Sequence, residues 1–201
     1  AEVRIIDAAW NGPDVDGAVI DLPGLGVSDF EMQQVGSAGL NAGDGAIAVP
    51  TWEQDWAYGG RVYSKPAMLM ASLELLVGSD AMRQLMRDYA ATWRFRHPTT
   101  RDFISSAETS TGQDLGWFFD AYLYGDAVLS DSLSLDIDST GSTRLQVHRL
   151  GSAPFPRQVE LTYPNRTQVL NVERSERLDV RLTEAPTSAR LLPVPLDRNA
   201  A

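Results

Sequence analysis

The sequence contains no cysteine and only two histidines, His97 and His148. The absence of cysteine excludes disulfide bonds, thiolate nucleophiles and cysteine-ligated zinc sites. A catalytic zinc ion usually takes three protein ligands, most of them histidines, and neither histidine lies in an H-E-x-x-H pattern. We therefore expect no metal to be bound by this chain alone.

The sequence also lacks long apolar runs and a basic surface. No apolar run approaches the roughly 18 residues of a membrane-spanning helix, so we expect no membrane span in this sequence. The chain has 17 Lys and Arg against 27 Asp and Glu, a formal net charge of −10, which argues against a nucleic-acid partner. Composition leaves the compartment undecided; we favour an extracytoplasmic location over a cytoplasmic one.

Residues 1–50 are the least regular part of the chain. Short β-like runs at Val3–Ile6, Ala18–Leu22 and Ala46–Val49 alternate with clusters of Gly, Pro, Asp and Asn, which predict turns. Asp14–Gly17 has the beginning of a calcium loop, but the later acidic ligands are missing, so we interpret it as a plain turn.

Residues 64–125 show the apolar spacing of four amphipathic helices. The first runs from Lys65 to Val77 and is followed by Gly78 as a cap. Ser79 is expected to cap the second, whose apolar stripe predicts core packing. The third begins at Thr99 with Asp102 three residues later, close to a capping box, and stops near Gly112. The fourth ends at Gly125. The second-helix stripe comprises Met82, Leu85, Met86, Tyr89 and Trp93.

The pattern changes to a two-residue alternation after about residue 131. Apolar residues alternate in five or six short segments between 132 and 192, separated by turn residues. This predicts a small antiparallel β-sandwich over residues 131–198, following a unit of residues 1–128, with the boundary near Ala127–Asp131. The expected fold class is α+β, a helical lobe followed by the sandwich.

Four segments resemble aminopeptidase-N-like (gluzincin) zinc metallopeptidases of bacterial type. They are Tyr58–Ala67, with its Tyr-Ser-Lys-Pro-Ala run, Leu73–Gly78, Tyr89–Phe103 and Gly112–Phe119, and together they cover about residues 50–126. One departure is Pro66, where many members have Gly; Pro is tolerated in the first turn of a helix. The resemblance implies that residues 1–128 are the C-terminal portion of a thermolysin-like catalytic domain.

In that family an H-E-x-x-H motif and a later Glu hold zinc, and the motif Glu acts as general base on zinc-bound water. These parts lie upstream in the family and are absent here. The resemblance therefore implies a piece of an enzyme whose full-length parent binds zinc and a peptide substrate. The missing N-terminal half of the catalytic domain would be its partner, and we expect the chain alone to be inactive.

The resemblance assigns Tyr63 as the residue that hydrogen-bonds the substrate carbonyl oxygen as it becomes an oxyanion. A phenol donates one directed hydrogen bond and is neutral at pH 7. Without the family context, Tyr63 would be interpreted as a buried aromatic at a helix start. Tyr58 lines the same cleft or has a packing role, and Lys65 either reaches a substrate carboxylate or is solvated in the first turn.

The histidines have structural interpretations. His97 is expected at the end of the second helix, where the helix dipole favours a cation, and His148 should point to solvent from a strand. The alternative to the enzyme is a non-catalytic interaction or structural module that retains the peptidase scaffold. A carbohydrate-binding sandwich is a third possibility, but residues 131–197 offer only Phe155 and Tyr163 as aromatic residues. The presence or absence of zinc ligands in the upstream reading frame distinguishes the enzyme from the non-catalytic module.

Overall fold

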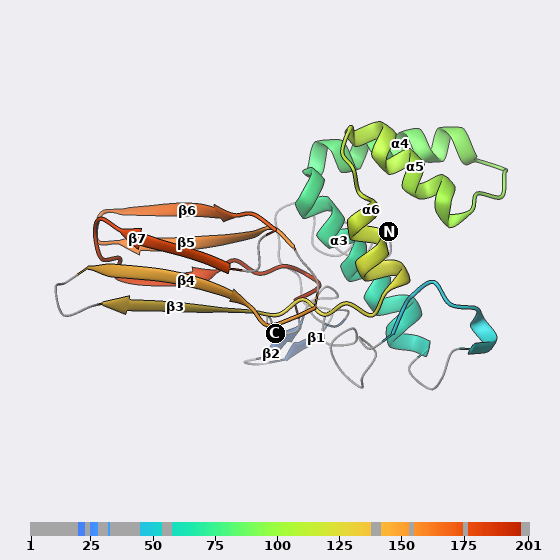
Figure 1. The fold of residues 1–201 in the computed structure, drawn as a ribbon. Coiled ribbons are helices and arrows are strands. Elements are labelled where there is room, and N and C mark those ends of the chain that lie inside the picture. The colour runs from blue at the N-terminus through green and yellow to red at the C-terminus, as the bar shows by residue number, and fades with distance from the viewer. Residues whose placement is uncertain are drawn as a thin grey trace. The chain divides into compact units, whose positions relative to one another are not determined.

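The computed structural model describes residues 20–22, 25–27, 32, 45–53, 58–137, 142–152, 155–174 and 177–197. The chain divides into two compact units, Ala1–Asp126 together with Ala201, and Ala127–Ala200. The first unit contains the helices and the second contains two antiparallel sheets (Figure 1). The α+β class predicted from the sequence is therefore confirmed.

The first unit begins with a two-stranded antiparallel pair, β1 (Ile20–Leu22) and β2 (Leu25–Val27). β1 lies within a predicted run, whereas β2 was not predicted. The prediction of a strand at Ala46–Val49 is wrong, because these residues form no strand. There the N–H groups of Ile47 and Ala48 both donate to the carbonyl oxygen of Leu123 at 3.0 Å, so these donors have a partner without a sheet. The predictions at Val3–Ile6 and Asp14–Gly17 lie outside the described residues.

The four predicted helices are confirmed, with two π-helical turns attached to them. Pro66 lies in the first turn of the first helix, and Gly78, with φ of +89°, ends it. A 3-10 turn, η1 (Thr51–Glu53), precedes them. In chain order the other elements are η2 (Gly60–Ser64, π), α3 (Lys65–Val77), α4 (Ser79–Trp93), α5 (Thr100–Thr111), α6 (Gly116–Phe119) and η3 (Asp120–Tyr124, π).

The ends of α5 follow from its sequence. The Thr99 hydroxyl accepts a hydrogen bond from the Asp102 N–H, and the Asp102 carboxylate accepts one from the Thr99 N–H at 2.8 Å, which completes the predicted capping box. Gly112 ends the helix in the left-handed conformation, with φ of +67°. The expected cap at Ser79 is wrong, because Ser79 is the first residue of α4 and its side chain caps nothing.

Aromatic rings join the helices of the first unit. The ring of Phe103 meets Tyr89 at 5.1 Å and Phe119 at 6.2 Å, both edge-to-face, so α4, α5 and α6 share one aromatic chain. Met86 departs from the predicted core stripe of α4, because its side chain is exposed. The buried apolar residues of this unit are Met68, Leu69, Leu73, Met82, Leu85, Ala107, Leu115, Phe118, Phe119 and Tyr122.

The second unit consists of two three-stranded antiparallel sheets, ordered β3-β4-β7 and β6-β5-β8. Leu145 and Val147 of the first sheet and Val159 and Leu161 of the second belong to one hydrophobic cluster, as period-two alternation requires. The strands are β3 (Asp131–Ile137), β4 (Thr143–Arg149), β5 (Arg157–Tyr163), β6 (Arg166–Val172), β7 (Arg177–Leu182) and β8 (Ser188–Leu191). Among the described helices of the chain, none combines the length and hydropathy needed to cross a membrane.

Candidate functional site

The structure brings Tyr58 and Tyr63 together. Their ring centroids lie 6.1 Å apart in an edge-to-face arrangement. The cause is the π-helical turn η2, in which the Lys65 N–H donates to the carbonyl oxygen of Gly60, five residues earlier. Residues five apart lie on different sides of a regular α-helix, which has 3.6 residues per turn, whereas a wider π turn brings them closer to the same side. Single π turns are rare and often accompany functional sites.

Both tyrosines present their rings to solvent. The exposed fraction is 63% for Tyr63 and 36% for Tyr58. The interpretation of Tyr63 as a buried packing aromatic at a helix start is therefore wrong. Tyr63 lies at the surface, two residues before the start of α3.

Lys65 lies on the opposite side of this turn and is buried, with an exposed fraction of 3%. Its Nζ donates a 2.7 Å hydrogen bond to the carbonyl oxygen of Gly45. Both interpretations made from the sequence, a solvated lysine and one that reaches a substrate carboxylate, are wrong. Lys65 is the only lysine in the chain, and it is used to hold a loop.

Arg61 is the second buried cation beneath the turn. Its guanidinium packs against the Cα of Gly45, where a Cβ would lie 3.2 Å from Cζ and Nε. Gly45 has φ of +109°, which residues with a side chain rarely adopt. Two cations of η2 and α3 thus converge on one glycine. Sequence reasoning missed Arg61 and Gly45, and the only available signal was the Gly-rich loop at 41–45.

The turn that carries Tyr58 and Tyr63 is packed against a loop and against the core of the first unit. Residues 45–48 are held to Lys65 on one side and to the Leu123 carbonyl of η3 on the other. Beneath the turn, Met68 and Leu69 of α3 are buried in the core. These contacts hold the backbone that carries Tyr63, and donors on a well-held backbone suit hydrogen bonding to a bound ligand.

The described part of the chain contains no group of three or more His, Cys, Asp or Glu side chains that could hold a metal ion. His97 is exposed and lies four residues beyond Trp93, where α4 ends, so the predicted position at the end of the second helix is wrong. His148 is half-buried on β4 and alternates with the inward Val147, so it lies on the outer face, as predicted.

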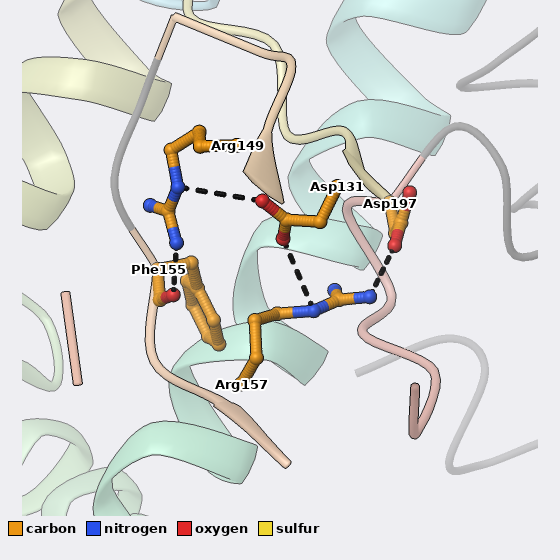
Figure 2. Close-up of polar contacts among 5 residues, drawn as sticks. All are labelled: Asp131, Arg149, Phe155, Arg157 and Asp197. Atoms are coloured by element: carbon orange, nitrogen blue, oxygen red, sulfur yellow. Dashed lines mark hydrogen bonds and ion pairs between the residues drawn. The ribbon is translucent and has the colours of Figure 1, made fainter. Parts of the chain in front are cut away.

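A polar cluster lies inside the second unit, residues 127–200 (Figure 2). Asp131 at the start of β3 pairs with Arg149 Nε at 3.3 Å and with Arg157 Nε at 3.2 Å. Arg157 Nη2 also contacts an Asp197 oxygen at 2.6 Å, and Arg149 Nη2 donates to the Phe155 carbonyl oxygen at 2.9 Å. The side chains of all four charged residues are nearly or fully buried.

Two carboxylates and two guanidiniums make this cluster electrically neutral, which is the condition under which charges are tolerated inside a protein. Burial raises the pKa of the Asp131 carboxyl, against the opposing effect of the Arg149 and Arg157 guanidiniums. Asp131 and Arg149 belong to one sheet and Arg157 to the other, so the cluster ties both sheets to the segment around Asp197. Its burial gives it a structural role and no access to a substrate.

Comparison with known proteins gives a structural match. No protein-family model matches the sequence, and no curated protein matches it. Among solved structures, the crystal structure of Legionella pneumophila aminopeptidase A in complex with aspartic acid is similar, with a TM-score of 0.53 and 20% identity. Over the matched residues, the fold of the chain is similar to that of a portion of this aminopeptidase. The match covers 71% of this chain but only 18% of the aminopeptidase, so it concerns less than a fifth of that protein.

Proposed function

We propose that this chain forms part of a zinc-dependent metallo-aminopeptidase and supplies the hydroxyl of Tyr63 to the substrate. In this proposal the scissile carbonyl of a peptide lies against Tyr63. The phenol hydroxyl donates a hydrogen bond to the carbonyl oxygen as negative charge develops on it. The observation that carries the proposal is an exposed tyrosine on a π-helical turn, in a chain whose fold is similar to part of an aminopeptidase. The neighbouring cations Lys65 and Arg61 are buried and pack on Gly45.

The described residues do not fit a zinc site, so the proposal assigns no zinc ligand to this chain. The ligands and the general base would come from residues elsewhere in the complete polypeptide. When bound, zinc would polarise the carbonyl and activate a water molecule. The role proposed for Tyr63 is supported by the family resemblance and by the exposure of its side chain. Tyr58 would contact the same substrate or support the Tyr63 ring through their edge-to-face contact.

The test uses the complete open reading frame that contains this chain, assayed for hydrolysis of aminoacyl p-nitroanilides with and without a zinc chelator. Tyr63→Phe keeps the ring and its contact with Tyr58 but removes the donor. We expect kcat to fall by about 10²–10³ with little change in KM, because the lost hydrogen bond is made chiefly in the transition state. Tyr58→Phe is the matched control, with a much smaller effect.

Unchanged kcat in Tyr63→Phe would disprove the role of this tyrosine. Absence of zinc-dependent hydrolysis in the complete protein would instead favour the alternative of a non-catalytic interaction or structural module. The 201-residue chain by itself should be inactive with added zinc. Zinc-dependent turnover by the isolated chain would contradict the placement of the ligands outside it.

A further inference from the structure

The connection between α4 and α5 carries a concentration of positive charge, although the chain as a whole has a net charge of −10. We call residues 94–101 the arginine tip. It contains Arg94, Arg96, His97 and Arg101, and no acidic residue occurs from position 89 to position 101. Figure 1 shows this connection at one end of the α4–α5 pair. All of these side chains are exposed.

Phe95, in the arginine tip, combines a solvent-exposed aromatic ring with an unfavourable backbone conformation. Its side chain is 94% exposed, and its φ of +61° makes it the one non-glycine residue in the described part of the chain with a positive φ. For a bulky side chain the left-handed conformation costs about 1–2 kcal/mol. Neither the exposure nor the conformation benefits the fold, and strain of this kind is concentrated at functional positions.

The arginines of the tip have no carboxylate partners among the described residues. The guanidinium of Arg94 lies over the Phe95 ring, with its carbon 5.0 Å from the centroid. Arg96 and Arg101 form no ion pair with any residue that the structure describes. Arg87 and Arg181 likewise have no ion pair among the described residues, so it is the clustering of the cations that distinguishes the tip. Ion pairs are made by Arg83, Arg144, Arg149, Arg157, Arg166 and Arg190. The tip thus gathers three arginines that have no carboxylate partner among the described residues, with their side chains exposed to solvent.

We propose that the arginine tip binds an anionic phospholipid surface, with the Phe95 ring entering the interface and the arginines contacting phosphate groups. A lipid surface offers a plane of negative charge next to an apolar layer. It therefore matches one apolar ring flanked by unpaired cations, and it demands no particular hydrogen-bond geometry. Arginine suits this role because its side chain extends apolar carbons while the guanidinium stays at the phosphates.

An acidic protein surface is the competing partner. A specific protein interface usually buries about 800 Å² on each side, much more than one loop tip provides. The screening length of about 8 Å at physiological ionic strength allows the tip to act locally, despite the acidic remainder of the chain.

The test is vesicle flotation with the purified chain, using phosphatidylcholine vesicles and vesicles in which part of the phosphatidylcholine is replaced by phosphatidylserine, an anionic lipid. We expect binding only to the anionic vesicles, and loss of binding at high salt. Phe95→Asn should weaken binding about ten-fold, because burial of the ring is lost. Phe95→Trp should preserve it. Asn tolerates the left-handed conformation, so the variant keeps the loop.

Charge is tested with Arg94→Gln/Arg96→Gln, which should weaken binding roughly ten- to thirty-fold. Arg181→Gln/Arg190→Gln removes the same charge away from the tip, from exposed strand residues, and should bind like the parent chain. Circular dichroism confirms that each variant is folded. Three results would overturn the proposal: no flotation with anionic vesicles at low salt, equal loss in both arginine pairs, or binding indifferent to Phe95→Asn. The last would leave a contact with head groups alone.

Discussion

The Nζ of Lys65 donates a 2.7 Å hydrogen bond to the carbonyl oxygen of Gly45, twenty residues earlier in the chain. This contact reverses the usual position of a lysine, because the ammonium group is buried and its partner is a backbone oxygen. A buried charge is tolerated only where hydrogen bonds replace water. The contact therefore holds the loop at 45–48 to the turn that carries Tyr63, and it links backbone conformation at Gly45 to the position of the tyrosine.

We predict that Gly45→Ala destabilises the helical unit by about 1–2 kcal/mol, because a Cβ at φ of +109° is strained and crowds the Arg61 guanidinium. The measurement is urea unfolding followed by tryptophan fluorescence. This signal reports the first unit alone, because all tryptophans precede residue 127: Trp10, Trp52, Trp56, Trp93 and Trp117.

Gly59→Ala is the matched control for this prediction. Gly59 has helical backbone angles, φ of −58° and ψ of −52°, and an added Cβ would meet nothing within 4 Å. This substitution should leave stability unchanged or raise it by about 0.5–1 kcal/mol. If Gly45→Ala proved as stable as Gly59→Ala, the close packing of Arg61 on Gly45 would be refuted.

The helices and strands that could be predicted from the sequence are those that depend on residues only a few positions apart. The capping box of Thr99 and Asp102 and the stop at Gly112 were predicted correctly, because both depend on residues a few positions apart. The strands of the second unit were likewise found from alternation, since each strand has one face in the shared core. The predicted cap at Ser79 was wrong, because Gly78 occupies the N-cap position of α4 and Ser79 is the first helical residue. Both residue types are compatible with a helix start, so the sequence alone did not decide between them.

The candidate site was harder to predict, because its contacts join distant segments. Tyr63 and Tyr58 were selected by resemblance to a family, and their approach requires a π turn that no propensity scale predicts. The burial of Lys65 depends on a glycine twenty residues away. The Asp131 cluster joins residues between 131 and 197, and its members are ordinary surface residue types until the strands bring them together.

The contact of Arg157 with Asp197 should be worth more than an ion pair at the surface. We predict that Asp197→Ala destabilises the second unit by about 3 kcal/mol, because it removes one of the two carboxylates that balance a buried guanidinium. Amide hydrogen exchange in β4 and β5, measured by NMR, reports the stability of this unit directly.

Glu160→Gln provides the comparison within the same unit. Glu160 pairs with Arg190 at 2.6 Å, but most of the Arg190 side chain is exposed. Surface pairs of this kind contribute little, so exchange protection in β4 and β5 should change much less than in Asp197→Ala. Equal effects of the two substitutions would contradict the special role of the buried cluster.

The capping box makes the stability of α5 depend on pH. Hydrogen bonds from the backbone and the hydroxyl of Thr99 hold the pKa of Asp102 below its ordinary value. A carboxyl with a lowered pKa in the folded state stabilises the fold above its unfolded pKa, near 3.9, and this contribution is lost as the pH falls through the folded pKa. We predict that Asp102→Asn lowers the Tm at pH 7, and that its difference from the parent chain shrinks below about pH 4. A difference that stayed constant down to pH 2 would contradict the prediction.

The backbone conformation of Phe95 leads to a prediction of increased stability. Asn adopts a positive φ much more readily than an aromatic residue, and the Phe95 ring makes no buried contact that would be lost. Phe95→Asn should therefore stabilise the helical unit by about 1 kcal/mol in tryptophan-monitored urea unfolding. Phe95→Val should have the opposite effect, because a β-branched side chain is the least compatible with φ of +61°. A stability order with Val above Asn would show that the loop does not hold this residue in the left-handed conformation in solution.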